Sequence, residues 1–121
     1  MRIYRLDSTA EIVAGDGTRL RELLHPGRRY PFSGRYSLAH AVLPSGQRSR
    51  KHRLTGDEVY VILQGEGILH VDNESSPVSP MDVIEIPPGS IQWLENTGAC
   101  ELAFLCIVDP AWQVHDEKIL E

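Results

Sequence analysis

The sequence predicts an all-β fold, a sandwich or barrel of short strands, for three reasons. The chain has 121 residues, 41% of them hydrophobic, which fits one compact domain spanning residues 1–121. Its 10 glycines and 8 prolines are spread between short apolar runs instead of forming one linker. Six of these runs have the length of a strand and are bounded by turn signals: residues 36–43, 59–63, 68–71, 83–86, 91–94 and 102–108.

The two ends of the chain are less regular than its middle. Residues 18–24, which include three leucines, fit either a strand or one helical turn. After the last apolar run, Asp109 can cap a helix and Pro110 can occupy its first position, so a helix is possible only at the C-terminus. Residues 113–121 are predicted to form a flexible tail.

The run from Glu58 to Leu63 is apolar on both faces. Val59 and Val61 alternate with Tyr60 and Ile62, and successive side chains point to opposite faces of a strand. A strand buried on both faces lies inside a layered structure or beneath a second subunit. Because so short a chain has little interior to cover both faces, we expect a homodimer.

Composition argues against several classes of partner. With 17 acidic and 12 basic residues the net charge is −5, which disfavours a nucleic-acid partner. No apolar run approaches the ~20 residues that a membrane span needs, and the first residues lack the apolar core of a signal peptide. Basic residues are densest between positions 48 and 53. This group either belongs to a solvated loop or serves to attract an anionic substrate: Arg48, Arg50, Lys51 and Arg53.

The two cysteines are predicted to stay reduced. Cys100 and Cys106 flank an apolar run, and six strand steps of ~3.3 Å separate their Cα atoms by about 20 Å. A disulfide needs about 4.4–6.8 Å. Reduced thiols and the absence of an export signal predict a cytoplasmic protein.

Two segments of the chain carry a recognisable spacing. The first reads Gly-x5-His-x-Leu-x3-Glu-x6-Gly over residues 46–65, at Gly46, His52, Leu54, Glu58 and Gly65. The second reads Met-x5-Pro-x-Gly-x2-Gln-x3-Asn over residues 81–96, at Met81, Pro87, Gly89, Gln92 and Asn96. This pair resembles the two motifs of the cupin superfamily, Gly-x5-His-x-His-x3-Glu-x6-Gly and Gly-x5-Pro-x-Gly-x2-His-x3-Asn. The resemblance implies a small, single-domain jelly-roll barrel.

The departures from the cupin pattern concern metal binding. The family pattern binds a divalent metal through two histidines and the glutamate of the first motif and the histidine of the second. Here Leu54 and Gln92 replace two of those histidines, and Met81 replaces a glycine. The resemblance therefore implies a weakened site at His52, Glu58 and Gln92, for zinc, manganese, iron, nickel or copper. His25 or His40 could complete it, and the alternative is a metal-free polar trio.

The same resemblance implies a pocket around these residues. Strand parity with Glu58 and Gln92 places Tyr60, Ile62 and Leu94 on the interior face. The resemblance implies that Phe104 and Cys106, which share a face, also point inward, and that Leu54 is part of an apolar wall. Cys106 is interpreted as a small buried side chain more readily than as a reactive thiol. Burial should raise the pKa of Glu58, which could then serve as a catalytic general base.

Two functions from different classes follow. In the first, the pocket binds a divalent metal and a small polar or anionic metabolite, with isomerase, lyase and oxygenase chemistry open. In the second, a metal-free pocket binds a small ligand as a sensor or stabilising partner without catalysis. Whether the chain is an enzyme is left undecided, because one fold hosts many functions.

Overall fold

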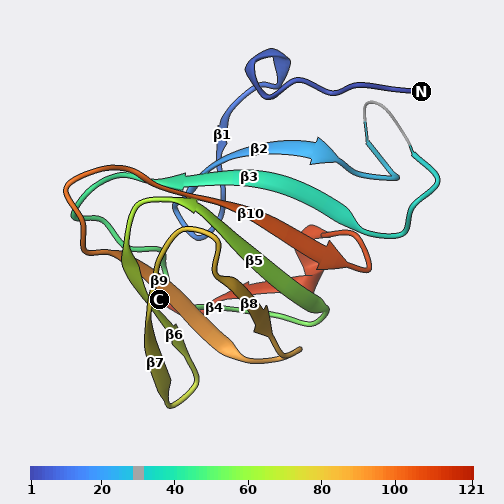
Figure 1. Ribbon diagram of the computed structural model, residues 1–121. Helices are drawn as coiled ribbons and strands as arrows, with labels where there is room; N and C mark the ends of the chain where they lie inside the picture. Colours follow the sequence, from blue (N-terminus) through green and yellow to red (C-terminus); the bar gives the residue numbers. More distant parts are fainter. Residues whose placement is uncertain (29–31) are drawn as a thin grey trace.

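The computed structural model describes residues 1–28 and 32–121, which form two antiparallel sheets (Figure 1). Within these ranges the first sheet has six strands, in the order β1 (Ile12–Val13), β2 (Arg19–Leu24), β3 (Ser37–Leu43), β10 (Leu102–Asp109), β5 (Asp57–Gln64) and β8 (Val83–Ile86). The second has five, in the order β11 (Glu117–Ile119), β4 (His52–Leu54), β9 (Ile91–Asn96), β6 (Gly67–Val71) and β7 (Glu74–Val78). The prediction of an all-β fold is confirmed.

All six predicted runs are strands, and the ambiguous segment is a strand as well. The runs correspond to β3, β5, β6, β8, β9 and β10. Residues 18–24 contain β2, whose pairing with β3 shifts in register between Glu22 and Leu24. That irregularity explains why the apolar pattern of this segment did not distinguish a strand from a helical turn.

Four further strands carry no apolar run of their own. The edge strand β7 is polar and exposed along most of its length and contains Pro77. β1, β4 and β11 have two or three residues each. Such short or polar segments become strands because an adjacent strand supplies hydrogen-bond partners, a long-range effect that local pattern does not contain.

The prediction of a flexible C-terminal tail is wrong. Residues 117–119 pair with β4, and the backbone N–H of Leu120 donates to the carbonyl oxygen of Lys51 at 2.8 Å. The Glu121 carboxylate accepts from the N–H of Lys51 at 2.7 Å. The C-terminal helix does not form either: the described helices are the short 3₁₀ segments Leu6–Ser8 and Val114–Asp116. A free edge on β4 explains this outcome, since pairing satisfies its backbone groups.

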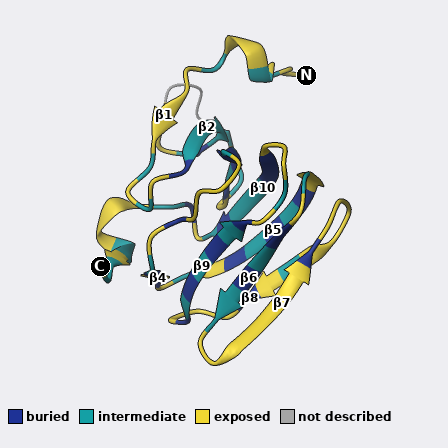
Figure 2. Ribbon diagram, turned by 90° about the vertical axis from the view of Figure 1, so that its left-hand side faces the viewer, coloured by how far each residue is buried: buried dark blue, intermediate teal, exposed yellow. Residues whose placement is uncertain are grey.

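The core lies between the two sheets and draws on both. It consists of Ala41, Leu43, Tyr60, Ile62, Leu69, Val78, Ile86, Leu94, Leu102 and Phe104. Gly65 of the first motif lies in the turn between β5 and β6, where glycine is needed because φ is +86° and a Cβ would lie 2.5 Å from the carbonyl oxygen of Glu101. Figure 2 shows the N-terminal segment and β7 as the most exposed parts.

Three smaller features of the structure relate to the sequence analysis. Cys100 is exposed, Cys106 is half-buried, and both are free thiols, as predicted. Met81, at the usual glycine position of the second motif, keeps a left-handed backbone with φ of +73°. In the described part of the chain, no helix has the length and apolarity needed to cross a membrane.

Candidate functional site

The strand register brings the predicted site residues to the interior face of the barrel. His52 on β4 lies opposite Gln92 on β9, and on the other sheet Cys106 lies opposite Tyr60. Directly paired residues of antiparallel strands point to the same face, so each pair shares one surface. Glu58 lies two residues from Tyr60 on β5 and points the same way. All but Cys106 are buried below a tenth of their full exposure.

Four of these side chains form one buried chain of hydrogen bonds. The Tyr60 hydroxyl donates to Gln92 Oε1 at 2.9 Å. The other end of the amide, Gln92 Nε2, donates to Glu58 Oε1. The remaining carboxylate oxygen, Glu58 Oε2, accepts from the Cys106 thiol at 2.9 Å. Both oxygens of the carboxylate and both ends of the amide are therefore engaged within the protein.

His52 belongs to a different contact. Its Nδ1 lies 2.8 Å from the carbonyl oxygen of Arg50, which can only accept, so Nδ1 carries a proton. Its Nε2 lies 3.8 Å from Asp16 Oδ2. Among the described residues, neither nitrogen bonds to Glu58 or Gln92. The metal-free trio expected from the sequence is thus a carboxylate–amide pair beside a separate histidine–aspartate pair.

Burial dominates the electrostatics of the chain. It raises the pKa of Glu58, opposed by hydrogen bonds from Cys106 and Gln92 and by the nearby charge of His52. Burial, and then the charge of Glu58, raise the pKa values of Tyr60 and Cys106 well above their usual range. Cys106 is therefore a neutral thiol, which supports its interpretation as a small buried side chain.

A cavity of about 410 Å³ opens beside this chain. Of the predicted pocket residues, it is lined by Tyr60, Phe104 and Cys106. The other three, Leu54, Ile62 and Leu94, are buried with 3%, 0% and 2% exposure and are not among the residues that line this cavity. Parity placed them on the interior face correctly, but apolar side chains fill that part of the barrel.

The cavity also has walls that the sequence did not predict. They come from the N-terminal segment, from β2 and from the region after β10, and include Asp16, Glu22, Arg28, Trp112 and Glu117. Asp16 is held by the backbone N–H of Thr18 at 3.1 Å, and the Trp112 indole donates to Glu117 at 2.8 Å. Asp16 lies between Gly15 and Gly17, a sequence typical of a turn, which by itself gives no reason to place Asp16 in the barrel.

The charged groups in the described lining of this cavity are mostly acidic. Its carboxylates are Asp16, Glu22, Glu58 and Glu117. The positive groups among its described lining residues are Arg28 and, when protonated, His52. Arg28 Nε lies 3.6 Å from Glu22 Oε1. The Arg28 Cζ atom lies over the Trp112 ring, 5.8 Å from the ring centroid.

The donor set does not fit the metal that the motif resemblance implies. Glu58 and Gln92 already use their oxygens as hydrogen-bond acceptors, and Leu54 supplies no ligand atom. Within residues 1–28 and 32–121, no three side chains among His, Cys, Asp and Glu are grouped so as to hold a metal ion. A divalent cation would have to break the Gln92–Glu58 contact to gain a single imidazole and one carboxylate.

Neither candidate histidine completes the set. His25 Nδ1 accepts from the Gly27 N–H at 3.0 Å, and its Nε2 contacts the Trp112 carbonyl at 2.7 Å, so both ring nitrogens are used. His40 is paired with Arg21 and Leu105, on the opposite face of the sheet from the cavity. Burial and the charge of Arg21 lower the pKa of His40.

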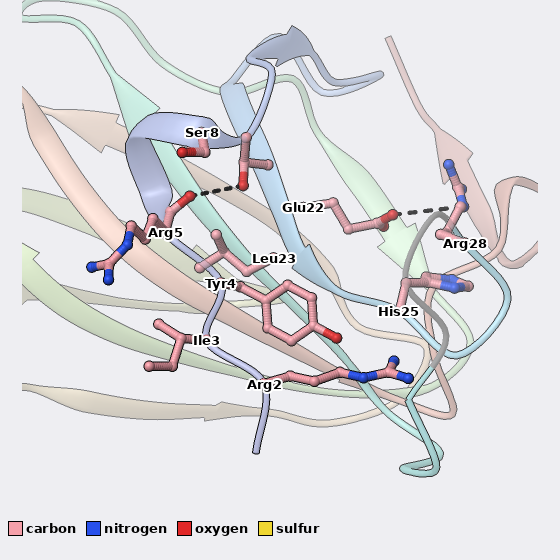
Figure 3. Close-up of a pocket in the computed structure, with 10 residues that line it drawn as sticks. Arg2, Ile3, Tyr4, Arg5, Ser8, Glu22, Leu23, His25 and Arg28 are labelled. Carbon is pink, nitrogen blue, oxygen red and sulfur yellow. Dashed lines mark hydrogen bonds and ion pairs between the residues drawn. The ribbon is translucent and has the colours of Figure 1, made fainter.

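A second hollow of about 720 Å³ lies outside the barrel, between the N-terminal segment and β2 (Figure 3). Its described lining residues include Arg2, Arg5 and Arg28, and the acidic residue among them is Glu22. In Figure 3 the Tyr4 ring lies near its centre, with the guanidinium of Arg2 beneath it. It shares Thr9, Glu22 and Arg28 with the barrel cavity.

Comparison with known proteins agrees with the fold and motifs. The family model of the cupin domain matches residues 39–108, and the chain belongs to the cupin family. It is 38% identical to an uncharacterized protein of Methanocaldococcus jannaschii over 117 residues, covering 95% of this chain and 91% of that protein.

Two further similarities are with proteins of Thermotoga maritima. The chain is 35% identical to an oxalate-binding protein over 71 residues, covering 58% of this chain and 59% of the other. It superposes on the crystal structure of a predicted oxalate decarboxylase with a TM-score of 0.76 and 26% identity, covering 88% of this chain and 97% of the other.

Proposed function

We propose that this cupin binds a small, uncharged or cationic molecule in the barrel cavity without a resident metal ion. The observation that carries the proposal is the closed hydrogen-bond chain from Tyr60 through Gln92 and Glu58 to Cys106. In this arrangement the motif residues bind one another in place of a cation. This favours the metal-free alternative over the metal-dependent function expected from the motifs.

The charge of the cavity supports the choice of ligand. An anion entering the barrel would approach four carboxyl groups, those of Asp16, Glu22, Glu58 and Glu117. Like charges at close range in a poorly solvated cavity repel strongly. Oxalate, which the names of two relatives mention, is a dianion and is therefore a poor candidate for this chain. An uncharged amide or an ammonium group matches the acceptors on the wall.

The apolar part of the lining limits the ligand to a compact molecule with an apolar body. Ala39, Ala41, Phe104 and Val108 line the cavity together with the ring of Trp112. Pockets of this kind bury most of a ligand against apolar side chains, while a few polar groups fix its orientation. Here Asp16, Glu58 and Glu117 are the polar groups that would do so.

Proton transfer on the bound ligand is a second candidate function. The observation in its favour is that Glu58 lines the cavity and has a pKa raised chiefly by burial. A carboxyl group whose pKa is raised holds a proton more readily than a free one, and isomerases and lyases use such groups for proton transfer. The Cys106 thiol would have to release Glu58 Oε2 for that oxygen to reach a substrate.

Metal analysis tests the first part of the proposal. Protein purified without a polyhistidine tag should contain no stoichiometric divalent metal, and Glu58→Ala should not change that. The double variant Leu54→His/Gln92→His restores the residue types of the family motif and serves as the positive control for metal loading. Stoichiometric metal in the wild type that is lost in Glu58→Ala would contradict the proposal.

Three probes of similar size test the preference for charge. Malonamide, 1,3-diaminopropane and malonate differ mainly in being neutral, dicationic and dianionic. Any ligand that binds only the folded state raises the melting temperature. We expect the amide and the diamine to raise it and malonate to leave it unchanged, with the effects absent in Asp16→Ala/Glu117→Ala. Stabilisation by malonate alone would show that the charge argument is wrong.

A further inference from the structure

Three polar side chains on the outer face of the second sheet are joined by hydrogen bonds. His70 on β6 pairs with Ser75 on β7 and with Trp93 on β9, and directly paired residues share one face. His70 Nδ1 lies 2.7 Å from Ser75 Oγ, and His70 Nε2 lies 2.7 Å from Glu95 Oε2. Leu69, the neighbour of His70, is buried in the core, so this face points away from the barrel cavity.

The two partners of the imidazole determine which of its nitrogens carries the proton. A carboxylate can only accept, so in the neutral ring Nε2 is protonated and donates to Glu95. Nδ1 is then the unprotonated nitrogen, and the Ser75 hydroxyl donates to it. A hydroxyl bonded to a base that a third group orients is the recurring arrangement of an activated nucleophile.

The imidazole is fixed, whereas the hydroxyl is open to solvent. The Trp93 ring stacks on the His70 ring, with centroids 4.3 Å apart and planes 7° apart. Lys51 Nζ lies 4.6 Å from the centroid of the Trp93 ring. The His70 side chain is 18% exposed, and Ser75 is exposed. A molecule from solvent can therefore reach the hydroxyl while the base keeps its orientation.

The backbone of Ser75 offers a hydrogen-bond donor next to the hydroxyl. β7 lies at the edge of its sheet, and Pro77, which has no N–H, pairs with Ile68. Pairs in an antiparallel ladder alternate between hydrogen-bonded and non-hydrogen-bonded, so the Ser75–His70 pair, two residues away, is also non-hydrogen-bonded. The Ser75 N–H therefore points to the open edge, where it can bind the oxygen of a carbonyl group attacked by Oγ.

We propose that Ser75, His70 and Glu95 form a second active site, which transfers the acyl group of a small ester to water. Ser75 Oγ bonds to the acyl carbon while its proton passes to His70 Nδ1 and the carbonyl electron pair moves to oxygen. The ester C–O bond then breaks, and the leaving alkoxide takes the proton from Nδ1. Glu95 accepts from Nε2 throughout and stabilises the imidazolium.

Water completes the reaction. It attacks the acyl carbon and gives its proton to His70 Nδ1; the bond to Ser75 Oγ breaks, Oγ takes that proton back, and a carboxylic acid leaves. The net reaction consumes an ester and a water molecule and gives an acid and an alcohol. Because Ser75 lies on an exposed edge strand and encloses the acyl group little, small esters with a good leaving group are the substrates that fit.

This site is independent of the proposed function. The described lining of the barrel cavity includes none of the three residues, which stand on the opposite face of the second sheet. Ligand binding in the barrel and ester hydrolysis at Ser75 can therefore fail separately.

Hydrolysis of p-nitrophenyl acetate tests the proposal, followed by the absorbance of p-nitrophenolate. Ser75→Ala removes the nucleophile and His70→Gln the base, and each should lower the rate by at least about tenfold. Ser76→Ala, on the same strand, and His115→Ala, at an exposed imidazole 3.5 Å from a carboxylate, are the matched controls and should leave the rate unchanged. Circular dichroism checks that each variant is folded.

Mass spectrometry of the acylated protein identifies the nucleophile. The acetyl group should be found on Ser75, and Ser75→Cys, which retains a nucleophile, should still be acylated, whereas a merely structural hydroxyl would not be replaced in this way. Glu95 is a positioning residue, so Glu95→Gln should lower kcat by about tenfold and leave KM unchanged.

Two kinds of result would overturn the proposal. One is a wild type that hydrolyses the ester no faster than Ser75→Ala, or controls that lose as much activity as Ser75→Ala. The other is an acetyl group found only on lysines or on the N-terminus, which would assign the reaction to surface amines.

Discussion

The two hollows of this cupin are neighbours with opposite charge. Among the described residues, the lining of the barrel cavity has four carboxyl groups, whereas that of the outer hollow has three arginines and one glutamate. They meet at Thr9, Glu22 and Arg28, which line both. The difference shows that a boundary of a few residues separates two electrostatic environments.

The two hollows also differ in how they are built. The side chains of the hydrogen-bonded chain beside the barrel cavity lie on paired strands and are bonded to one another. The outer hollow is bounded by the N-terminal segment, whose 3₁₀ helix contains no buried residue. Strand register therefore determines the geometry of the first site, while the second depends on few packing contacts. Substitutions in the barrel should cost more stability than substitutions in the outer hollow.

The largest effect is expected for Gln92→Leu. The substitution removes the partner of the Tyr60 hydroxyl and of Glu58 Oε1, both buried. Each unsatisfied group costs about 1–3 kcal/mol, so the free energy of unfolding should fall by about 2–4 kcal/mol in urea titrations. The exposed Gln113→Leu should change it by less than about 0.5 kcal/mol. Equal effects of the two variants would contradict the buried chain of hydrogen bonds.

A smaller effect is expected for Glu58→Gln, seen in the pH dependence of stability. Because burial raises the pKa of Glu58 in the folded state, the folded protein binds the proton more tightly than the unfolded chain. The stability gained by binding this proton is fully present below the pKa of Glu58 in the unfolded chain. It is lost as the pH rises through the pKa of Glu58 in the folded protein. Glu58→Gln should therefore be more stable than the wild type at neutral pH, with the advantage shrinking on acidification.

Thermal unfolding between pH 4 and 8 gives this difference, with Glu74→Gln on the exposed strand β7 as the control. Only the difference between variant and wild type is informative, since the lowered pKa of His40 acts with the opposite sign. A Glu58→Gln variant that loses stability at neutral pH would mean that the carboxylate is stabilised by a partner stronger than the Cys106 and Gln92 bonds.

The smallest effect on stability is expected for Arg28→Ala, at the boundary of the two hollows. Its ion pair with Glu22 is half-exposed, so the free energy of unfolding should change by less than about 1 kcal/mol. The barrel cavity nevertheless loses a positive charge, and binding of 1,3-diaminopropane should tighten by roughly threefold in calorimetry. Arg5→Ala, which alters only the outer hollow, should leave diamine binding unchanged. The opposite order would show that the diamine occupies the outer hollow.

Much of the site could be predicted from residue spacing. The motif spacing predicted that His52, Glu58 and Gln92 share one interior, and strand parity with Glu58 added Tyr60. The cupin resemblance added Cys106. Parity could not separate a residue that lines a cavity from one that fills the core, as Ile62 shows. That distinction depends on which opposite side chains are large enough to fill the space between the sheets.

Other parts of the site depended on segments with no pattern of their own. Asp16 and Glu117 reach the cavity from a turn and from a three-residue strand, and Arg28 from a loop after β2. Their position is set by contacts with residues distant along the chain, such as the pairing of β11 with β4. Local propensity contains no information about those contacts.

By itself, the sequence determined the β architecture, the family and the identity of the residues that meet inside the barrel. These follow from the alternation of side chains and from glycines and prolines at fixed spacing, which act over a few residues. Only the tertiary structure decided that the carboxylate, amide, hydroxyl and thiol bond to one another, and that the cavity beside them is acidic. Hydrogen-bond geometry and burial are set by distances between strands, so they exist only once the sheets have come together.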